Sequence, residues 1–295
     1  MDLRGVLPPV PTPFRDDEVD VEGLRVNIAA LLRAPVRGIV VLGSNGEAPF
    51  LDEDESERVV AAARAVVPAD RVLVAGTGRQ ATRATVRATR RAAAAGADAV
   101  LVRTPSFFKS EMTSDAFVRH YRTVADESRV PVLLYNYTAV TGVSLRPDAV
   151  ARLSEHPNVI GLKESGGDAG QIADYVAVAP AGFAVLAGAG PTFYPCLAAG
   201  ATGGILAVAN VVPALCIQLY DLVQAGHHAE ARDLQRRLVP LARAVTTGFG
   251  VAGLKVALEL VGLTGGPPRA PLLPAPPEAA EVIRRQLIGL AVPVP

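Results

Sequence analysis

The amino-acid sequence predicts an α/β protein, a (β/α)₈ TIM barrel with a C-terminal helical extension. Short apolar runs rich in β-branched residues recur along the chain, and each is followed by a polar or alanine-rich segment with helical periodicity. The chain has 295 residues and half of them are hydrophobic, which suits a barrel folded as one unit around a large core.

Eight apolar runs are the predicted strands. In chain order they are Gly5–Val10, Gly38–Leu42, Arg71–Ala75, Ala99–Arg103, Val130–Tyr135, Val159–Lys163, Ala184–Ala187 and Gly204–Val208. Helix signals between them predict helices at Glu53–Val66, Gln80–Ala95, Ser114–Glu127 and Pro213–Gln224. Strands that alternate with helices form right-handed units with a parallel sheet, and eight units in this length match a closed barrel better than an open sheet.

The remainder of the chain is predicted to be helical, without a further strand. Helices are expected at His227–Thr247, Val251–Leu260 and Glu278–Leu287, with the Pro-rich stretch Gly265–Pro277 as a connector. We therefore expect the barrel and its active site in residues 1–225, and a helical appendage packed on the barrel in residues 226–295.

Charge and composition narrow the possible partners. The 29 basic and 29 acidic residues cancel, which leaves no electrostatic footprint for nucleic acid and no polybasic membrane patch. Residues 183–220 carry no charge, but glycines and prolines divide them into short runs that are typical of buried strands. Asp2, Arg4 and several prolines interrupt the N-terminal segment, so we expect no signal peptide and a cytoplasmic protein.

Neither a metal site nor a nucleotide cofactor is predicted. Gly248–Gly253 satisfies the pattern G-x-G-x-x-G, but it follows a predicted helix and lacks an acidic residue at the required distance. No strand end carries histidine and carboxylate residues at metal-binding spacing, and the two cysteines fit no metal or disulfide motif. The four histidines are expected at the surface: His120, His156, His227 and His228.

Lysine usage points to one candidate nucleophile. The chain has 26 arginines but only three lysines, Lys109, Lys163 and Lys255. Lys163 ends a predicted buried strand, and strand alternation places it on the same face as Ser165 and opposite Glu164. If that face is the barrel interior, the ammonium loses hydration and a neutral, nucleophilic amine becomes available. A lysine paired with a carboxylate or reaching toward solvent is the structural alternative.

Two further strand ends carry groups suited to acid–base chemistry and anion binding. Tyr135 ends the preceding strand, where its hydroxyl could move protons, although a core tyrosine with one hydrogen bond is the alternative. Backbone N–H groups of the turn Gly43–Glu47 and the hydroxyl of Ser44 suit a small carboxylate or phosphate. Ser44, Asn45 and Gly46 are therefore candidate binding residues, unless the glycines serve only the geometry of the turn.

The strand-end motifs resemble those of the pyruvate-dependent class I aldolase family, which includes dihydrodipicolinate synthase, N-acetylneuraminate lyase and 4-hydroxy-2-oxoglutarate aldolase. The resemblance covers almost the whole chain and rests on motifs in the same order: GSNGE, PVLLYN, VIGLKESGGD, LAGAG and GGILAVAN. It implies a barrel enzyme that needs no cofactor, because Lys163 forms a Schiff base with pyruvate or a related 2-oxo acid. It also implies a homotetramer built as a dimer of dimers.

The resemblance assigns roles to five more residues. Ser44 and Asn45 would hold the carboxylate of the 2-oxo acid, and Tyr135 would relay protons. Ser165 would line the site beside the lysine, and Ile205 would contact bound pyruvate.

Two positions depart from the pattern of dihydrodipicolinate synthase. Its carboxylate-binding arginine, a few residues after the strand-end tyrosine, is replaced by Val140. The family commonly places a tyrosine, which reaches into the partner subunit's site, two residues after a Thr-Pro pair, and Phe107 stands there. The first departure predicts poor condensation with aspartate semialdehyde, and the second removes one member of the usual proton relay.

The motifs GSNGEAPFL, AVTTGFGVAGLK and GGPPRAPL most resemble 4-hydroxy-2-oxoglutarate aldolase. The sequence therefore predicts a lyase that cleaves 4-hydroxy-2-oxoglutarate to pyruvate and glyoxylate. The enzymatic alternatives are condensation of pyruvate with aspartate semialdehyde, or aldol cleavage or dehydration of a sugar acid. A degraded barrel that only binds a 2-oxo acid is the alternative outside catalysis.

Overall fold

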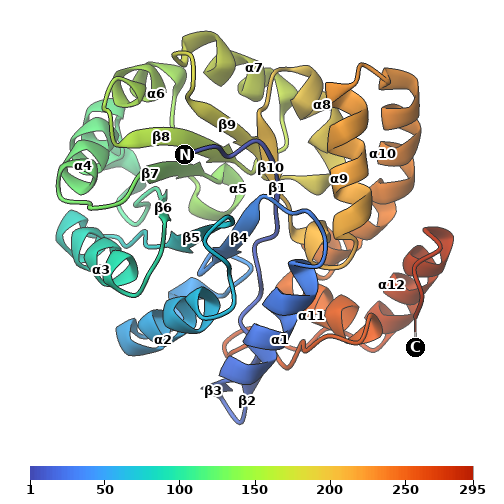
Figure 1. Cartoon of the computed structure of the whole chain (residues 1–295). Coiled ribbons are helices and arrows are strands. Elements are labelled where there is room, and N and C mark those ends of the chain that lie inside the picture. The colour runs from blue at the N-terminus through green and yellow to red at the C-terminus, as the bar shows by residue number, and fades with distance from the viewer. Residues whose placement is uncertain (295) are drawn as a thin grey trace.

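Eight parallel strands surrounded by helices form a (β/α)₈ barrel (Figure 1), as predicted. The structure is a computed structural model of the chain and describes residues 1–294. The barrel strands are β1 (Gly5–Leu7), β4 (Gly38–Val41), β5 (Val72–Gly76), β6 (Ala99–Arg103), β7 (Val132–Asn136), β8 (Val159–Glu164), β9 (Ala184–Ala187) and β10 (Gly203–Ile205). Their order in the sheet is β1-β10-β9-β8-β7-β6-β5-β4, so each strand after β1 lies beside its sequence neighbour.

Backbone hydrogen bonds join β4 to the segment after β1 and so close the barrel. The N–H of Val10 donates to the carbonyl of Val40 at 2.8 Å, and the N–H of Val40 donates to the carbonyl of Pro8 at 3.0 Å. Strand β1 itself ends at Leu7 rather than at Val10 as predicted. The prolines that follow lack an N–H group, so they cannot continue a regular ladder.

Helices cover the outside of the barrel. Those of the barrel are α1 (Val21–Leu31), α2 (Glu53–Arg64), α3 (Thr82–Ala94), α4 (Ser114–Asp126), α5 (Thr138–Thr141), α6 (Pro147–Ser154), α7 (Ala169–Val178), α8 (Phe193–Ala198) and α9 (Pro213–Gln224). One hairpin was not predicted, β2 (Phe14–Arg15) with β3 (Glu18–Val19), because two-residue strands carry no readable periodicity.

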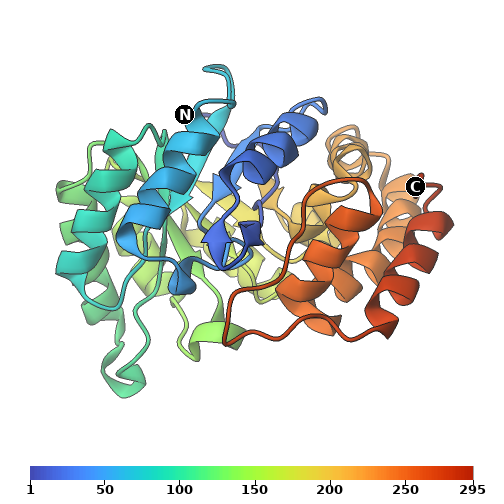
Figure 2. The same ribbon diagram turned by 90° about the horizontal axis from the view of Figure 1, so that it is seen from below.

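The C-terminal helices lie along one side of the barrel (Figures 1 and 2). They are α10 (His228–Arg243), α11 (Gly250–Leu260) and α12 (Glu278–Gly289), close to the predicted ranges. A π-helical turn, Ala244–Gly248, joins α10 to α11, and the G-x-G-x-x-G pattern runs from the end of this turn into the first turn of α11. The domain boundary at residue 225 stays a prediction. Within residues 1–294, no helix is both long and apolar enough to cross a bilayer.

The protein has two apolar cores, and alternate side chains of each barrel strand point into one or the other. The outer core lies between strands and helices, whereas the barrel interior holds a second cluster that includes Leu7, Val40, Leu101, Leu133 and Ile205. Side chains one residue apart therefore enter different cores. This rule decides which residues at the strand ends can reach the interior of the barrel.

One histidine is buried, contrary to the surface position expected for it. The His120 side chain is 5% exposed, its Nδ1 lies 2.9 Å from the Thr82 hydroxyl, and its Nε2 has no hydrogen-bond partner among the described residues. It sits on the apolar face of α4, which packs against the barrel. Burial lowers the pKa of this imidazole from its ordinary value of 6.5 to about 4.

We expect His120 to make folding sensitive to acid. Because the unfolded chain binds its proton near pH 6.5 and the folded chain only near pH 4, stability is lost as the pH falls through this window. The full shift is worth about 3 kcal/mol. Urea unfolding at several pH values measures this effect. As the pH is lowered from 6.5 to 4, the free energy of unfolding should fall less steeply for His120→Gln than for the parent. Parallel pH profiles of the two proteins would contradict this role.

Candidate active site

Three polar side chains stand side by side at the carboxyl ends of neighbouring strands. Arg103 of β6 is in register with Tyr135 of β7, which is in register with Lys163 of β8. All three have the parity of interior residues such as Leu101 and Leu133. The carboxyl end of a barrel is where the active sites of this fold lie.

Lys163 is buried, and no carboxylate of residues 1–294 is paired with it. Its side chain is 3% exposed, and its Nζ lies 4.4 Å from the centroid of the Tyr135 ring. No ion pair or hydrogen bond of its ammonium is formed with any residue between 1 and 294. The contrast is Lys255, also buried, whose Nζ lies 2.6 Å from a Glu47 oxygen. The salt-bridged alternative for Lys163 is therefore wrong, and its amine is left free for chemistry.

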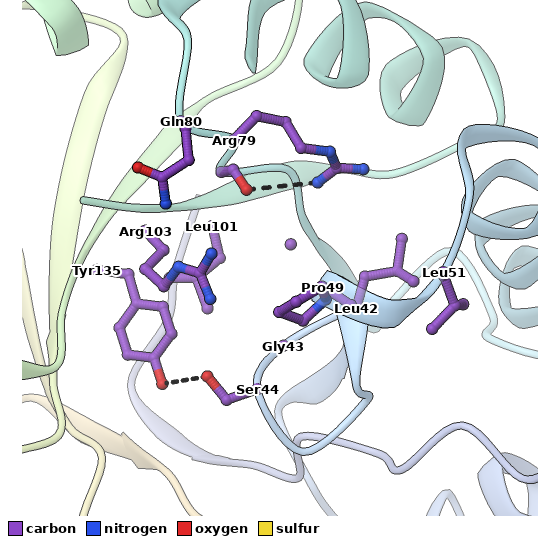
Figure 3. Close-up of a pocket in the computed structure, with 13 residues that line it drawn as sticks. Leu42, Gly43, Ser44, Pro49, Leu51, Arg79, Gln80, Leu101, Arg103 and Tyr135 are labelled. Atoms are coloured by element: carbon purple, nitrogen blue, oxygen red, sulfur yellow. Dashed lines mark hydrogen bonds between the residues drawn. The ribbon is translucent and has the colours of Figure 1, made fainter. Parts of the chain in front are cut away.

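The Tyr135 hydroxyl contacts Ser44 rather than standing alone in the core. Its oxygen lies 3.2 Å from the Ser44 hydroxyl, and Figure 3 shows this pair at one edge of a cavity. The two side chains come from β7 and from the turn after β4, which are separated by 91 residues. A hydrogen-bonded pair of hydroxyls beside a buried amine can pass a proton between them.

A cavity of about 270 Å³ contains the Lys163 side chain together with most of the predicted binding residues. Asn45, Ser165 and Ile205 line it with Lys163 and Tyr135. Its size suits a small organic acid rather than a nucleotide. Gly188 allows the loop after β9 to approach closely, because a Cβ there would meet the Ser165 hydroxyl at 2.1 Å.

Ser44 and Gly46 are the predicted binding residues that do not line this cavity. Ser44 lines a neighbouring cavity, whereas Gly46 lines neither. Gly46 is buried behind the turn, where its N–H donates to the carbonyl of Gly43 at 3.1 Å. Its own carbonyl accepts a hydrogen bond from the Thr12 hydroxyl at 2.7 Å. Because both of its polar groups are engaged within the protein, Gly46 supports the turn instead of presenting an N–H group to a ligand.

A buried ion pair that the sequence did not predict supports the turn after β4. Glu47 has a positive φ of 54°, and its carboxylate is paired with Lys255 of α11 and accepts from the N–H of Arg269 at 2.8 Å. Glu47 and Lys255 are each 1% exposed. No local pattern connects residues more than 200 positions apart. The C-terminal helices thus fix the turn that carries Ser44 and Asn45.

Glu164 and Asn136 form a second buried network, on the outer side of the same strand ends. The Asn136 amide donates to a Glu164 oxygen at 2.6 Å, and the other oxygen accepts from the N–H of Gly166. Burial raises the pKa of the Glu164 carboxyl. The alternation of side chains along the strand predicted that Glu164 and Lys163 point to opposite faces, as observed. The network anchors the loop that carries Ser165 and lies outside the cavity.

The C-terminal appendage also contributes directly to the cavity wall. Arg243, Thr246 and Thr247 are among the residues that line it. The π-helical turn widens the backbone at this point, a distortion often found at functional sites. Sequence reasoning had no signal for these residues, because a π-turn has no recognisable side-chain period.

A second cavity, of about 290 Å³, is lined by the Ser44–Tyr135 pair (Figure 3). Arg79, Gln80 and Arg103 line it together with this pair. In Figure 3 the Arg103 side chain runs alongside the Tyr135 ring. Burial lowers the pKa of the Arg103 guanidinium, and Arg79 is paired with Glu53 at 3.0 Å.

Phe107, which replaces the usual relay tyrosine, lies outside both cavities. Its side chain is 77% exposed and packs edge to face on Phe108, with ring centroids 5.1 Å apart. The backbone N–H of Phe107 is held by the Gln80 amide oxygen at 3.0 Å. Within one chain, neither ring reaches the Ser44–Tyr135 pair.

Comparison with known proteins assigns the family. The model of the dihydrodipicolinate synthetase family matches residues 2–288. The chain belongs to this family. A 4-hydroxy-tetrahydrodipicolinate synthase from Methanothrix thermoacetophila is 38% identical over 98% of this chain and 97% of its own length. A protein named as a probable mitochondrial 4-hydroxy-2-oxoglutarate aldolase from Emericella nidulans is also 38% identical, over 94% of this chain and 92% of its own length.

Solved structures agree with this membership of the dihydrodipicolinate synthetase family. Dihydrodipicolinate synthase from Thermotoga maritima superimposes with a TM-score of 0.93 at 31% identity, covering 97% of this chain and 98% of its own. A monomeric dihydrodipicolinate synthase variant gives 0.94 at 31% identity, covering 98% and 97%. The family and the fold predicted from the motifs are therefore confirmed, and a lyase or synthase class follows for this chain.

Proposed function

We propose that this protein is a Schiff-base enzyme that joins pyruvate to an aldehyde, or cleaves the corresponding product. The observation that carries the proposal is the buried, unpaired amine of Lys163 in a cavity with Tyr135, Asn45, Ser165 and Ile205. A degraded barrel is less well supported, because the three residues expected to do chemistry lie together. No further cofactor is needed by this chemistry.

In the proposed reaction, the Lys163 amine attacks the ketone carbon of pyruvate and water leaves, which gives an imine. Loss of a proton from the methyl carbon gives an enamine, which forms a carbon–carbon bond with the aldehyde while the aldehyde oxygen takes up a proton. Water then hydrolyses the imine and releases both the product and the free amine. Cleavage is the same sequence in reverse. We assign the proton transfers to Tyr135 and Ser44, whose hydroxyl oxygens lie 3.2 Å apart.

Two aldehydes are candidates for the second substrate. The relatives favour aspartate semialdehyde, since the synthases named above outnumber the aldolase, and this reverses the ranking that the sequence motifs suggested. The observation that favours cleavage of 4-hydroxy-2-oxoglutarate to pyruvate and glyoxylate is Val140, which is 57% exposed and provides no side-chain donor for a second carboxylate. Cleavage or dehydration of a sugar acid has less support, because none of the relatives described above is named as an enzyme of sugar acids.

A direct comparison of kcat/KM distinguishes the two candidates. The purified protein is assayed for condensation of pyruvate with aspartate semialdehyde and for cleavage of 4-hydroxy-2-oxoglutarate. The larger kcat/KM identifies the substrate pair. If neither reaction exceeds the rate without enzyme, and pyruvate with borohydride leaves the protein unlabelled, the proposed function is wrong.

We also propose that the chain forms a homotetramer, as the resemblance implies. The exposed apolar pair Phe107 and Phe108 supports an interface between subunits, because adjacent exposed phenyl rings favour burial. One similar structure is described as a monomeric variant, so the fold alone does not determine the oligomeric state.

Tyr135→Phe is expected to lower kcat by at least about tenfold, because it removes the hydroxyl of the proton-carrying pair. Phe107→Tyr is the matched variant, since it adds a hydroxyl where the family usually has one. It should keep or raise kcat. Steady-state kinetics of both variants on one substrate check these expectations. If Phe107 instead shapes an apolar pocket, Phe107→Tyr will mainly raise KM, and a fully active Tyr135→Phe would exclude the relay.

A further inference from the structure

The charges that line the Lys163 cavity are all positive. Of its lining residues, Lys163 and Arg243 carry charge, and none within residues 1–294 is an aspartate or glutamate. Asn45 and the nearby turn are proposed to hold the carboxylate of pyruvate. A second cation without a neutralising carboxylate suits a second anionic group on the other reactant.

Arg243 is free to bind such a group. It is the last residue of α10, it is exposed, and none of the ion pairs or side-chain hydrogen bonds between residues 1 and 294 involves it. Arg236, on the same helix, is by contrast paired with Asp233 at 2.8 Å. An unpaired guanidinium at the wall of a cavity can grip a carboxylate through two parallel N–H groups.

Two threonine hydroxyl groups lie close to Arg243 along the chain. Thr246 and Thr247 follow on the π-helical turn and line the same cavity. Tyr137 and Ala139, from the segment after β7, also line the cavity, and neither is a cation. An anionic group entering the cavity therefore finds its charged partner on the C-terminal helices rather than on the segment after β7.

We propose that Arg243 binds the carboxylate of the aldehyde substrate and selects aldehydes that carry one. This proposal rests on the proposed pyruvate chemistry at Lys163. Arg243 of α10 would provide the cation that is missing at position 140, where Val140 replaces an arginine. The cavity then accommodates two carboxylates, one near Asn45 and one at Arg243, with the Lys163 amine in the same space.

The test measures selectivity between aldehydes with the full-length protein. Condensation with pyruvate is assayed for acetaldehyde, which has no carboxylate, and for whichever of aspartate semialdehyde and glyoxylate reacts faster. The parent should prefer the carboxylate-bearing aldehyde. Arg243→Met should lower kcat/KM for that aldehyde about 100-fold, mainly through KM, and leave the acetaldehyde reaction unchanged.

Two matched variants and one trapping experiment complete the design. Arg237→Met removes an exposed arginine of the same helix that does not line the cavity, and it should keep the preference. Arg103→Met removes an arginine that lines the second cavity, and it should keep the preference as well. The inference is overturned if Arg243→Met keeps the preference, or if Arg103→Met loses it while Arg243→Met does not. Borohydride trapping of pyruvate separates the two levels: a parent that is not labelled refutes the proposed chemistry, whereas a labelled parent without any preference refutes only the role of Arg243.

Discussion

Replacing Lys163 with alanine is expected to abolish both turnover and covalent labelling by pyruvate and borohydride. Lys163 carries the proposed nucleophile, its side chain is 3% exposed, and no carboxylate of the described residues 1–294 holds it as a structural cation. Removing the group that forms the covalent intermediate leaves no equivalent route to the enamine. Rate assays and intact-protein mass measurement check both losses in one preparation.

Peptide mapping of the labelled parent locates the modified lysine. Label should appear on Lys163 alone, because Lys255 is paired with Glu47 and Lys109 is exposed, away from the cavity. Borohydride-dependent label on either of the other two lysines would show that the nucleophile has been misassigned. Lys109→Ala is the matched control, and it should label as the parent does.

Lys255→Met is expected to destabilise the protein by about 3–5 kcal/mol, because it leaves the Glu47 carboxylate buried without its partner charge. Lys255 also donates to the carbonyl of Pro267 at 2.8 Å and lies over the Phe14 ring. Burial lowers the pKa of its ammonium, which the contact with Glu47 opposes. Urea unfolding of the parent and the variant measures the loss.

A double variant separates the charge effect from packing. Lys255→Met with Glu47→Gln removes both charges, keeps an acceptor for the N–H of Arg269, and should recover much of the lost stability. A single variant within about 1 kcal/mol of the parent, or a double variant no more stable than the single, would show that the pair does not hold the turn as inferred.

Local pattern was sufficient for the barrel and for the strand end that carries the proposed nucleophile. Apolar runs with a turn signal after each one predict eight strands, because a strand buried on both faces must be apolar over its length. Period-two alternation puts Lys163 and Glu164 on opposite faces of the strand, since neighbouring side chains leave a strand in opposite directions. The folded barrel then shows that the face of Lys163 is the inner one. The strands and their alternation depend on residues close together in the chain.

Tertiary structure decided which distant groups complete the site. The sequence indicated a binding turn. It did not show that the N–H and carbonyl groups of Gly46 are hydrogen-bonded within the protein, or that Lys255 of α11 pairs with Glu47. Nor could periodicity place Arg243 in the wall of the Lys163 cavity, because its position depends on a π-helical turn and on how α10 packs against the barrel. Contacts between residues 100 or more positions apart leave no periodic trace in a single sequence, so only the folded chain brings them together.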